Sequence, residues 1–213
     1  MASNTQYYVD FDGTIAPGDP NFYFFKRWAA DSWEALDNAW HAGEISSRVC
    51  MAAKINKLRV SLADYETYAN AVELDPWFKR FVTKVRAQGA GILIVSDGLD
   101  QTIAPALSAA HLDIPVAANR LRHVANDRWA VEFPFRRNDC ANDMGTCKCA
   151  HIAEHKPTHS VLIGDGRSDF CLAEKVDFVF AKGALAEFCE QRGLAHEKIK
   201  TFEDVCAALD RAG

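Results

Sequence analysis

The chain has 213 residues, of which 49% are hydrophobic, and a formal net charge of −5 at pH 7. This length suits one domain with a sizeable insertion, and the hydrophobic fraction is sufficient for a buried core. The negative charge gives no electrostatic reason to expect nucleic acid or an anionic membrane surface as a partner. No apolar run approaches the roughly 18 residues of a membrane span. The seven scattered cysteines suit a reduced compartment, so a cytoplasmic location is expected.

Four short apolar runs predict strands of a parallel sheet, because strands covered on both faces are typically apolar on both sides. They occupy residues 7–11, 91–95, 160–163 and 177–180. Helical patterns alternate with them at 76–88, 101–111, 168–175 and 185–191, and a weaker strand is expected at 115–117. The alternation predicts an α/β fold with a Rossmann-like, doubly wound parallel sheet and right-handed crossovers.

Two segments interrupt this alternation. Residues 16–75 carry a helical pattern without a convincing strand, and they directly follow the first predicted strand. We therefore expect a helical cap domain at 16–75, inserted into a catalytic core formed by residues 1–15 and 76–213. Within the core, residues 120–135 predict a hairpin whose turn lies at 125–128.

The end of the first strand carries two acids, Asp10 and Asp12, followed by Gly13. Side chains alternate along a strand, so both carboxylates are expected on the same side. They would then lie at the C-terminal edge of a parallel sheet, where open α/β folds bind ligands. Two acids this close repel each other, and a divalent cation is the usual compensation. Taken alone, the segment is equally typical of a strand that ends in a turn rich in aspartate.

Three further segments favour a site over a simple turn. Ser96 and Asp97 end the second strong strand with a hydroxyl and backbone N–H groups that suit a phosphate oxygen. Asp165 and Asp169 flank a tight turn after another strand, and Lys148 precedes them in a loop that leads into a helix. Acids and a hydroxyl at the ends of parallel strands, together with a lysine in a loop between them, predict a combined metal and phosphate site.

This order of motifs resembles the haloacid dehalogenase superfamily over essentially the whole chain. The motifs are Asp10-Phe11-Asp12-Gly13-Thr14, then Ser96, Lys148, and Asp165-Gly166-Arg167-Ser168-Asp169. The helical insertion after the first motif is similar to the cap of the phosphoserine phosphatase subgroup. The segment at 134–149 looks most like the phosphatases of methionine salvage. The resemblance implies a phosphatase that acts on a small phosphorylated metabolite.

The resemblance also implies a role for each motif residue. Asp10 would attack phosphorus and form an aspartyl phosphate, while Asp12 would protonate the leaving oxygen and then activate water. Mg²⁺ would bind the Asp10 carboxylate, the Asp12 backbone carbonyl and Asp165. The remaining residues would support these groups: Asp169 would anchor metal-bound water, and Ser96, Asp97 and Lys148 would hold the phosphate.

Substrate choice is expected in the cap. In the phosphoserine phosphatases, a glutamate nine residues after the nucleophile and an arginine of a cap helix recognise the amino acid. This sequence has Asp19 at the first position, and its nearest cap-helix cations are Arg48 and Lys54. A lysine lacks the bidentate fork with which arginine binds a carboxylate. The expected substrate is therefore an uncharged or hydroxylated small phosphate ester, with phosphoserine a poor one.

Several alternatives stay open from the sequence. Lys156 also precedes the last motif and could replace Lys148. The thiols of Cys140, Cys147 and Cys149 could hold zinc, although they lack the usual four-ligand pattern. The same fold could also transfer phosphoryl groups, cleave phosphonates or serve as a binding module without catalysis.

The aromatic residues of the expected cap have two interpretations. Phe22 to Phe25, together with Trp28, Trp33 and Trp40, could form the core of the cap or line a hydrophobic substrate pocket. Their helical spacing favours a core. The histidines show no metal-ligand spacing, so solvated positions are expected for them.

Overall fold

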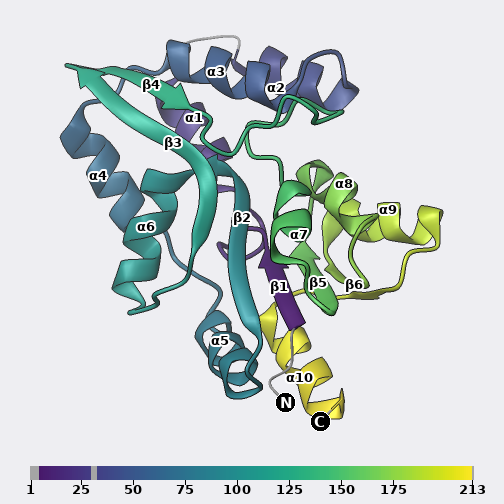
Figure 1. Ribbon diagram of the computed structural model, residues 1–213. Helices are drawn as coiled ribbons and strands as arrows, with labels where there is room; N and C mark the ends of the chain where they lie inside the picture. Colours follow the sequence, from purple (N-terminus) through teal and green to yellow (C-terminus); the bar gives the residue numbers. More distant parts are fainter. Residues whose placement is uncertain (1–4, 30–32, 213) are drawn as a thin grey trace.

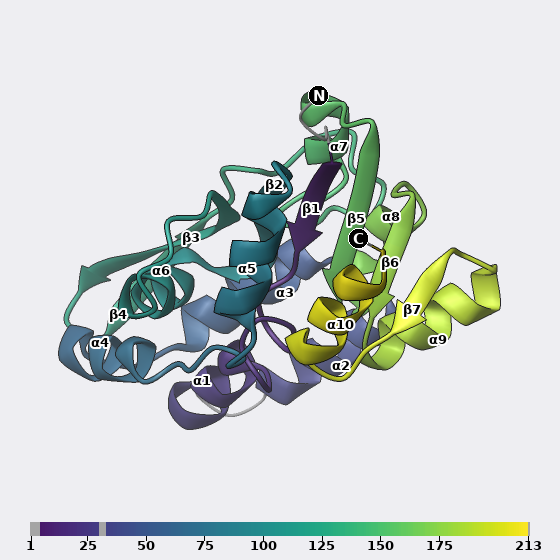
Figure 2. The same cartoon turned by 90° about the horizontal axis from the view of Figure 1, so that it is seen from below.

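The computed structural model describes residues 5–29 and 33–212, which form a seven-stranded sheet flanked by helices (Figures 1 and 2). The strands are β1 (Thr5–Val9), β2 (Gly91–Leu99), β3 (Val116–Ala125), β4 (Arg128–Glu132), β5 (His159–Gly164), β6 (Phe178–Ala181) and β7 (His196–Lys198). Their order across the sheet is β4-β3-β2-β1-β5-β6-β7. All neighbours are parallel except β3 and β4, which pair antiparallel. The predicted doubly wound α/β fold is confirmed.

Helices cover both faces of this sheet, as the apolar character of its strands requires. They are α5 (Phe78–Ala87), α6 (Asp100–Ala109), α7 (Ala150–His155), α8 (Phe170–Ala173), α9 (Gly183–Arg192) and α10 (Phe202–Ala212), with a 3₁₀ turn η1 at Arg167–Asp169. One hydrophobic cluster joins the sheet to α5, α6 and α10. A second cluster joins the opposite face to α7, α8 and α9. No helix in the described residues has the length and apolar character needed to cross a membrane.

Strand register brings the motif residues to one edge of the sheet. Val9 of β1 pairs with Ile94 of β2 on one side and with Ile163 of β5 on the other. The chain positions that follow these partners therefore lie at the same C-terminal edge. This parallel alignment brings Asp10, Ser96 and Asp165 together although they are far apart in the sequence.

The segment after β1 folds into four helices above that edge (Figure 1). They are α1 (Pro20–Trp28), α2 (Trp33–Ala42), α3 (Ser47–Lys57) and α4 (Leu62–Asn70). Side chains of Asp19, Ser46 and Ser61 cap α1, α3 and α4 by accepting a backbone N–H of the first turn. Buried aromatics, including Phe24, form a hydrophobic cluster that belongs to this region.

The hairpin predicted at 120–135 is present as the outer part of β3 and β4, with its turn at Asn126 and Asp127. It packs against the cap helices, because Leu121 and Trp129 belong to the same hydrophobic cluster as Phe24. Trp129 also donates its indole N–H to the Val60 carbonyl at 2.9 Å. The hairpin thus completes the core of the cap region, although the sequence grouped it with the catalytic core.

Several elements differ from the sequence predictions. β2 continues through Ser96 and Asp97 to Leu99, and the predicted helix at 168–175 is divided between η1 and α8. β7 and α10 were not predicted. For β7 the reason is its length, because a strand of three residues leaves almost no periodic signal. The expectation of solvated histidines is wrong for His151, which is 6% exposed beneath Phe135.

Candidate active site

A cavity of about 190 Å³ lies between the edge of the sheet and the cap helices. Its floor is built from residues that follow parallel strands: Asp10, Asp12, Ser96, Asp97 and Asp165. Its roof is built from cap residues: Asp19, Asn21, Asp37, Trp40, Ser47 and Lys54. All predicted site residues except Lys148, Asp169 and Arg48 therefore line one cavity.

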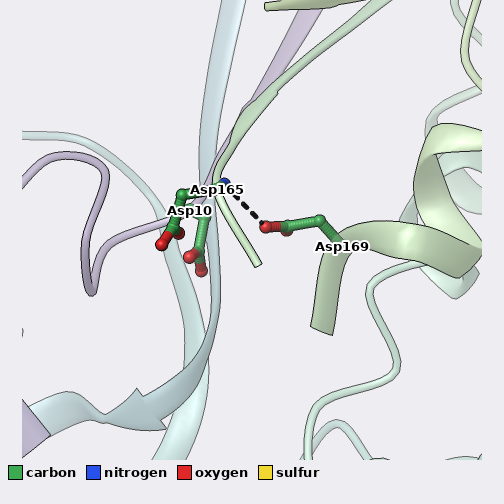
Figure 3. A group of neighbouring side chains, drawn as sticks. All are labelled: Asp10, Asp165 and Asp169. Carbon is green, nitrogen blue, oxygen red and sulfur yellow. Dashed lines mark hydrogen bonds between the residues drawn. The ribbon is translucent and has the colours of Figure 1, made fainter. Parts of the chain in front are cut away.

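Three carboxylates converge at the base of the site (Figure 3). One oxygen each from Asp10, Asp165 and Asp169 lies within 4.8 Å of the others. Thr14 donates its hydroxyl to Asp165 at 3.0 Å and fixes the direction of that carboxylate. Oxygen ligands at this spacing are what Mg²⁺ prefers. Among the described residues, no other group of His, Cys, Asp and Glu has metal-binding spacing.

Gly13, in the first turn after β1, leaves space for the Asp165 carboxylate. Gly13 adopts a left-handed conformation with φ +76°, and a Cβ at this position would overlap the Asp165 carboxylate. Any other residue at this position would be strained and would displace an acid of the cluster. The motif glycine therefore permits both the sharp exit of the chain and the close approach of Asp165.

Asp169 has two tasks visible in the structure. One carboxylate oxygen accepts the backbone N–H groups of Asp165 and Gly166 at 3.2 and 3.3 Å, and Figure 3 shows the first of these bonds. The other oxygen accepts the Lys148 ammonium at 2.7 Å. Asp169 thus orders the turn that presents Asp165 and holds the lysine in place.

Lys148 provides the positive charge at the bottom of the site. Its Nζ donates to Asp10 at 2.7 Å and to Ser168 at 3.0 Å, and the residue is 2% exposed. Burial disfavours the charged form, but the Asp10 and Asp169 carboxylates raise the pKa of Lys148 above its usual value. The alternative, Lys156, is exposed at the end of α7. The geometry thus places Lys148, and not Lys156, against Asp10.

The acids of the site carry perturbed pKa values. Burial raises the pKa of Asp10, and the nearby Lys148 opposes this shift. Burial likewise raises the pKa of Asp165 to about 6. Two or three buried carboxylates with one lysine leave excess negative charge, which a divalent cation would offset.

Asp12 has an environment that differs from that of Asp10. Burial and the Asp19 carboxylate raise its pKa to about 8, so it can hold a proton near neutral pH. Its Oδ2 accepts the Asn21 amide at 2.8 Å and lies 3.4 Å from the Ser96 hydroxyl. A carboxyl group that is protonated at neutral pH suits a general acid, whereas the lysine-paired Asp10 suits a nucleophile.

The carboxylate of Asp97 accepts hydrogen bonds from other residues of the protein. It accepts the Thr146 backbone N–H at 2.8 Å, the Asn119 amide at 3.2 Å and the Ser47 hydroxyl of the cap. Burial raises its pKa to about 6. The side chain thus connects β2, β3, the loop before Lys148 and the cap helix α3.

The three predicted specificity residues lie in different places. Asp19 lines the cavity and also caps α1 through the Phe22 N–H at 2.9 Å. Lys54 lines the cavity as well, and its Nζ pairs with Asp37 at 2.7 Å.

Arg48 does not line the cavity. It forms an ion pair of 2.8 Å with Asp143 at the margin between cap and core. Residues six positions apart on a helix point roughly 120° apart, since each residue turns about 100°. For that reason Lys54 and Arg48 of α3 cannot both face the site.

Other lining residues were missed by sequence reasoning. Trp40, His41 and Asp37 of α2 carry no motif signal, although Trp40 was among the aromatics considered for a pocket. Arg167 lies inside the last motif, and its guanidinium donates to the His41 carbonyl at 2.6 Å. Asn21, two positions after Asp19, was also overlooked.

The remaining aromatics and cysteines have structural positions. Phe24, Phe25 and Trp33 are buried in the cap, as their helical spacing predicts, whereas Tyr23 is exposed. The Sγ atoms of Cys149 and Cys171 lie 2.6 Å apart. No cysteine of the described chain belongs to a metal-binding group, so nothing favours the zinc alternative.

Known proteins are similar to this chain in sequence and in fold. Residues 8–174 match the haloacid dehalogenase-like hydrolase family. A 2-hydroxy-3-keto-5-methylthiopentenyl-1-phosphate phosphatase of Brevibacillus brevis is 29% identical over 99% of this chain and 97% of its own length. The enzyme of that name from Geobacillus kaustophilus is 28% identical over 99% and 98%. A phosphoserine phosphatase solved as a phospho-aspartyl intermediate analogue superposes with a TM-score of 0.73, at 14% identity over 97% and 99% of the two chains.

Proposed function

The chain belongs to the haloacid dehalogenase-like hydrolases and is a phosphoric monoester hydrolase, and we propose that it acts through a phosphorylated aspartate at Asp10. One observation carries this proposal. Asp10 is paired with Lys148 at 2.7 Å, and Asp12, with a raised pKa, lines the same cavity. One site thus holds two carboxyl groups, of which the nucleophile Asp10 is needed without a proton and the acid Asp12 with one.

The reaction follows in two displacements. A carboxylate oxygen of Asp10 bonds to phosphorus as the ester P–O bond breaks, and Asp12 gives its proton to the leaving oxygen. Asp12 then takes a proton from water, which attacks the aspartyl phosphate and releases inorganic phosphate. Ser96 and Lys148 hold the phosphoryl oxygens during both steps, and Lys148 lowers the pKa of Asp10 against the effect of burial, which favours the carboxylate form needed for attack.

The carboxylates fit a resident Mg²⁺. Asp10, Asp165 and the backbone carbonyl of Asp12 would hold the ion, and Asp169, which orders the Asp165 turn, would anchor the water around it. When bound, Mg²⁺ supplies positive charge against the phosphoryl group and relieves the repulsion between the acids. The excess negative charge of this buried cluster supports the assignment.

The roof of the cavity suits a small, uncharged organic group that carries hydroxyl or carbonyl oxygens. Lys54 is already paired with Asp37, the Arg167 guanidinium at the cavity donates to the His41 carbonyl, and Asp19 adds a further acid. The named activity of the bacterial relatives, on a hydroxy-keto phosphate ester, supports the same class.

A direct test is phosphate release from p-nitrophenyl phosphate by metal-free protein titrated with Mg²⁺. We expect turnover to require the metal, and Asp165→Ala to need a much higher Mg²⁺ concentration for half-maximal rate. In a crystal grown with Mg²⁺ and beryllium fluoride, the anion should bond to Asp10 and contact Ser96 and Lys148. Metal-independent turnover, or none on any ester of a metabolite panel, would overturn the proposal. An alcohol acceptor that captured the phosphoryl group in place of water would instead indicate a phosphotransferase.

Asp19 is expected to contribute to substrate choice. Asp19→Asn keeps an oxygen that can cap α1 but removes the charge that faces the cavity. We expect kcat/KM on the hydroxy-keto phosphate ester to fall about 5- to 150-fold, the equivalent of 1–3 kcal/mol for a buried hydrogen bond. The value on p-nitrophenyl phosphate should change little, because that compound has no hydroxyl for Asp19.

Ser61→Ala is the matched control for the cap. It removes the N-cap of α4, another cap helix, without touching the cavity. Its two efficiencies should stay in the wild-type ratio. An equal drop on both compounds in Asp19→Asn would assign Asp19 to helix capping alone.

A further inference from the structure

Asn21 is buried against the proposed general acid. It lies in the first turn of α1, lines the catalytic cavity and is only 8% exposed. Its Nδ2 donates to Oδ2 of Asp12 at 2.8 Å. Buried amides are normally satisfied on both sides, yet Asn21 Oδ1 has no hydrogen-bond partner within the described chain.

The hydrogen bonds of Asp12 are strongly asymmetric. Its Oδ2 receives the Asn21 amide and lies near the Ser96 hydroxyl, whereas its Oδ1 is buried without a partner in the described structure. The Asn21 amide is the shorter of the two contacts to Oδ2, and it joins the carboxyl group of the core to the first turn of α1.

The position of this pair is fixed from both sides. A Cβ on Gly98 would overlap both Asp12 Oδ2 and Asn21 Nδ2, so the two side chains pack directly on the backbone of β2. On the cap side, Asp19 caps α1, and the Tyr68 hydroxyl donates to the Pro20 carbonyl at 2.5 Å. Asn21 is thus held by the cap while it orients an acid of the core.

We propose that Asn21 is a positioning residue that holds the Asp12 carboxyl group in place for proton transfer to the leaving group. The inference rests on the proposed function, in which Asp12 is the acid. Asn21 does not touch the phosphoryl group in this role; it acts through Asp12. The loss of Asn21 should therefore resemble the loss of the acid, and its cost should depend on how much the leaving group needs a proton.

Two aryl esters of nearly equal shape test this dependence. Phenyl phosphate releases a phenol with a pKa of about 10, like that of tyrosine, whereas p-nitrophenyl phosphate releases a stabilised anion that needs little protonation. General acid catalysis contributes roughly 10²–10⁴-fold. For Asn21→Ala we expect kcat/KM on phenyl phosphate to fall about 10- to 100-fold and kcat/KM on p-nitrophenyl phosphate to fall less than about threefold. This ratio reports the steps up to release of the phenol, so hydrolysis of the aspartyl phosphate, which is common to both esters, does not enter it.

Further variants separate positioning from folding. Asn21→Leu keeps the branched shape and removes the donor without adding a charge beside Asp12, so it should show the same selective loss. Asn38→Ala, an exposed asparagine of α2, should match wild type on both esters. Adding Asn21→Ala to Asp12→Asn should cost nothing more on phenyl phosphate, because both changes remove one function.

The outcomes distinguish the two proposals. Equal losses of kcat/KM on the two esters in Asn21→Ala and Asn21→Leu, or additive losses in the double variant, would overturn the role of Asn21. If Asp12→Asn lowered kcat/KM equally on both esters, Asp12 would not be the acid and the proposed function would need revision. A wild-type protein that hydrolysed neither ester with Mg²⁺ would contradict the proposed function itself.

Discussion

Asp10→Asn is expected to abolish turnover while the protein stays folded. An amide is a poor nucleophile, and loss of a covalent nucleophile typically costs about 10⁴-fold or more in kcat. Asparagine has nearly the same shape, and its carbonyl oxygen can still accept the Lys148 ammonium that now bonds to Asp10 at 2.7 Å. The melting temperature should therefore change little compared with the loss of rate.

Phosphate release from p-nitrophenyl phosphate at saturating Mg²⁺ gives the decisive measurement. Excess metal should not restore Asp10→Asn, since the missing function is the bond to phosphorus. Asp113→Asn makes the same chemical change at an exposed position and should behave as wild type. A rate above about 1% of wild type would assign the nucleophile to another residue.

The core of this site was predictable because its residues are placed by local rules. Asp10 and Asp165 each follow a strand that is recognisable from its apolar run, and parallel pairing of β1 with β5 aligns their ends. Ser96 follows from the same alignment with β2. Such positions can be predicted from the alternation of side chains along a strand and from the parallel direction of the strands in the sheet.

The cap side was less predictable because its geometry depends on contacts between distant segments. Arg48 and Lys54 looked equivalent on α3, yet Lys54 faces the cavity and Arg48 binds Asp143 of a core loop. The bond from Arg167 to the His41 carbonyl joins residues 126 positions apart. No local sequence pattern predicts a contact between residues so far apart in the chain.

Asp97 illustrates the same limit within the core. The sequence predicts its backbone N–H beside the phosphate and leaves the partners of its carboxylate undetermined. That carboxylate is bound by Thr146, Asn119 and Ser47, which come from three separate segments. Which partner a carboxylate takes is decided by tertiary packing, and burial then requires that its hydrogen bonds be satisfied inside the protein.

Lys148→Met is expected to damage both stability and activity. The side chain keeps its length but leaves Asp10 and Asp169 buried without the ammonium that bonds to each at 2.7 Å. Removing one partner of a buried ion pair costs about 3–5 kcal/mol, which corresponds to a fall in Tm of roughly 10 °C for a chain of this size. Turnover should fall about 10²–10³-fold, because phosphoryl oxygens also lose a cation.

The pH dependence of this stability loss identifies its cause. Lys148 lowers the pKa of Asp10, which burial already holds above its ordinary value, so the variant should raise that pKa further. A buried acid with a raised pKa favours its protonated form in the folded state, and stability then falls as the pH rises above the unfolded value of about 3.9. The Tm deficit of Lys148→Met should therefore be larger at pH 8 than at pH 5.

Lys156→Met provides the matched control, since it makes the same change at an exposed lysine eight positions along the chain. Surface changes of this kind usually alter stability by less than about 0.5 kcal/mol, so its Tm and rate should equal those of wild type at both pH values. A Tm deficit in Lys148→Met that did not depend on pH would point to lost packing in place of uncompensated charge. Loss of activity in Lys156→Met with retention in Lys148→Met would transfer the phosphate-binding role to Lys156.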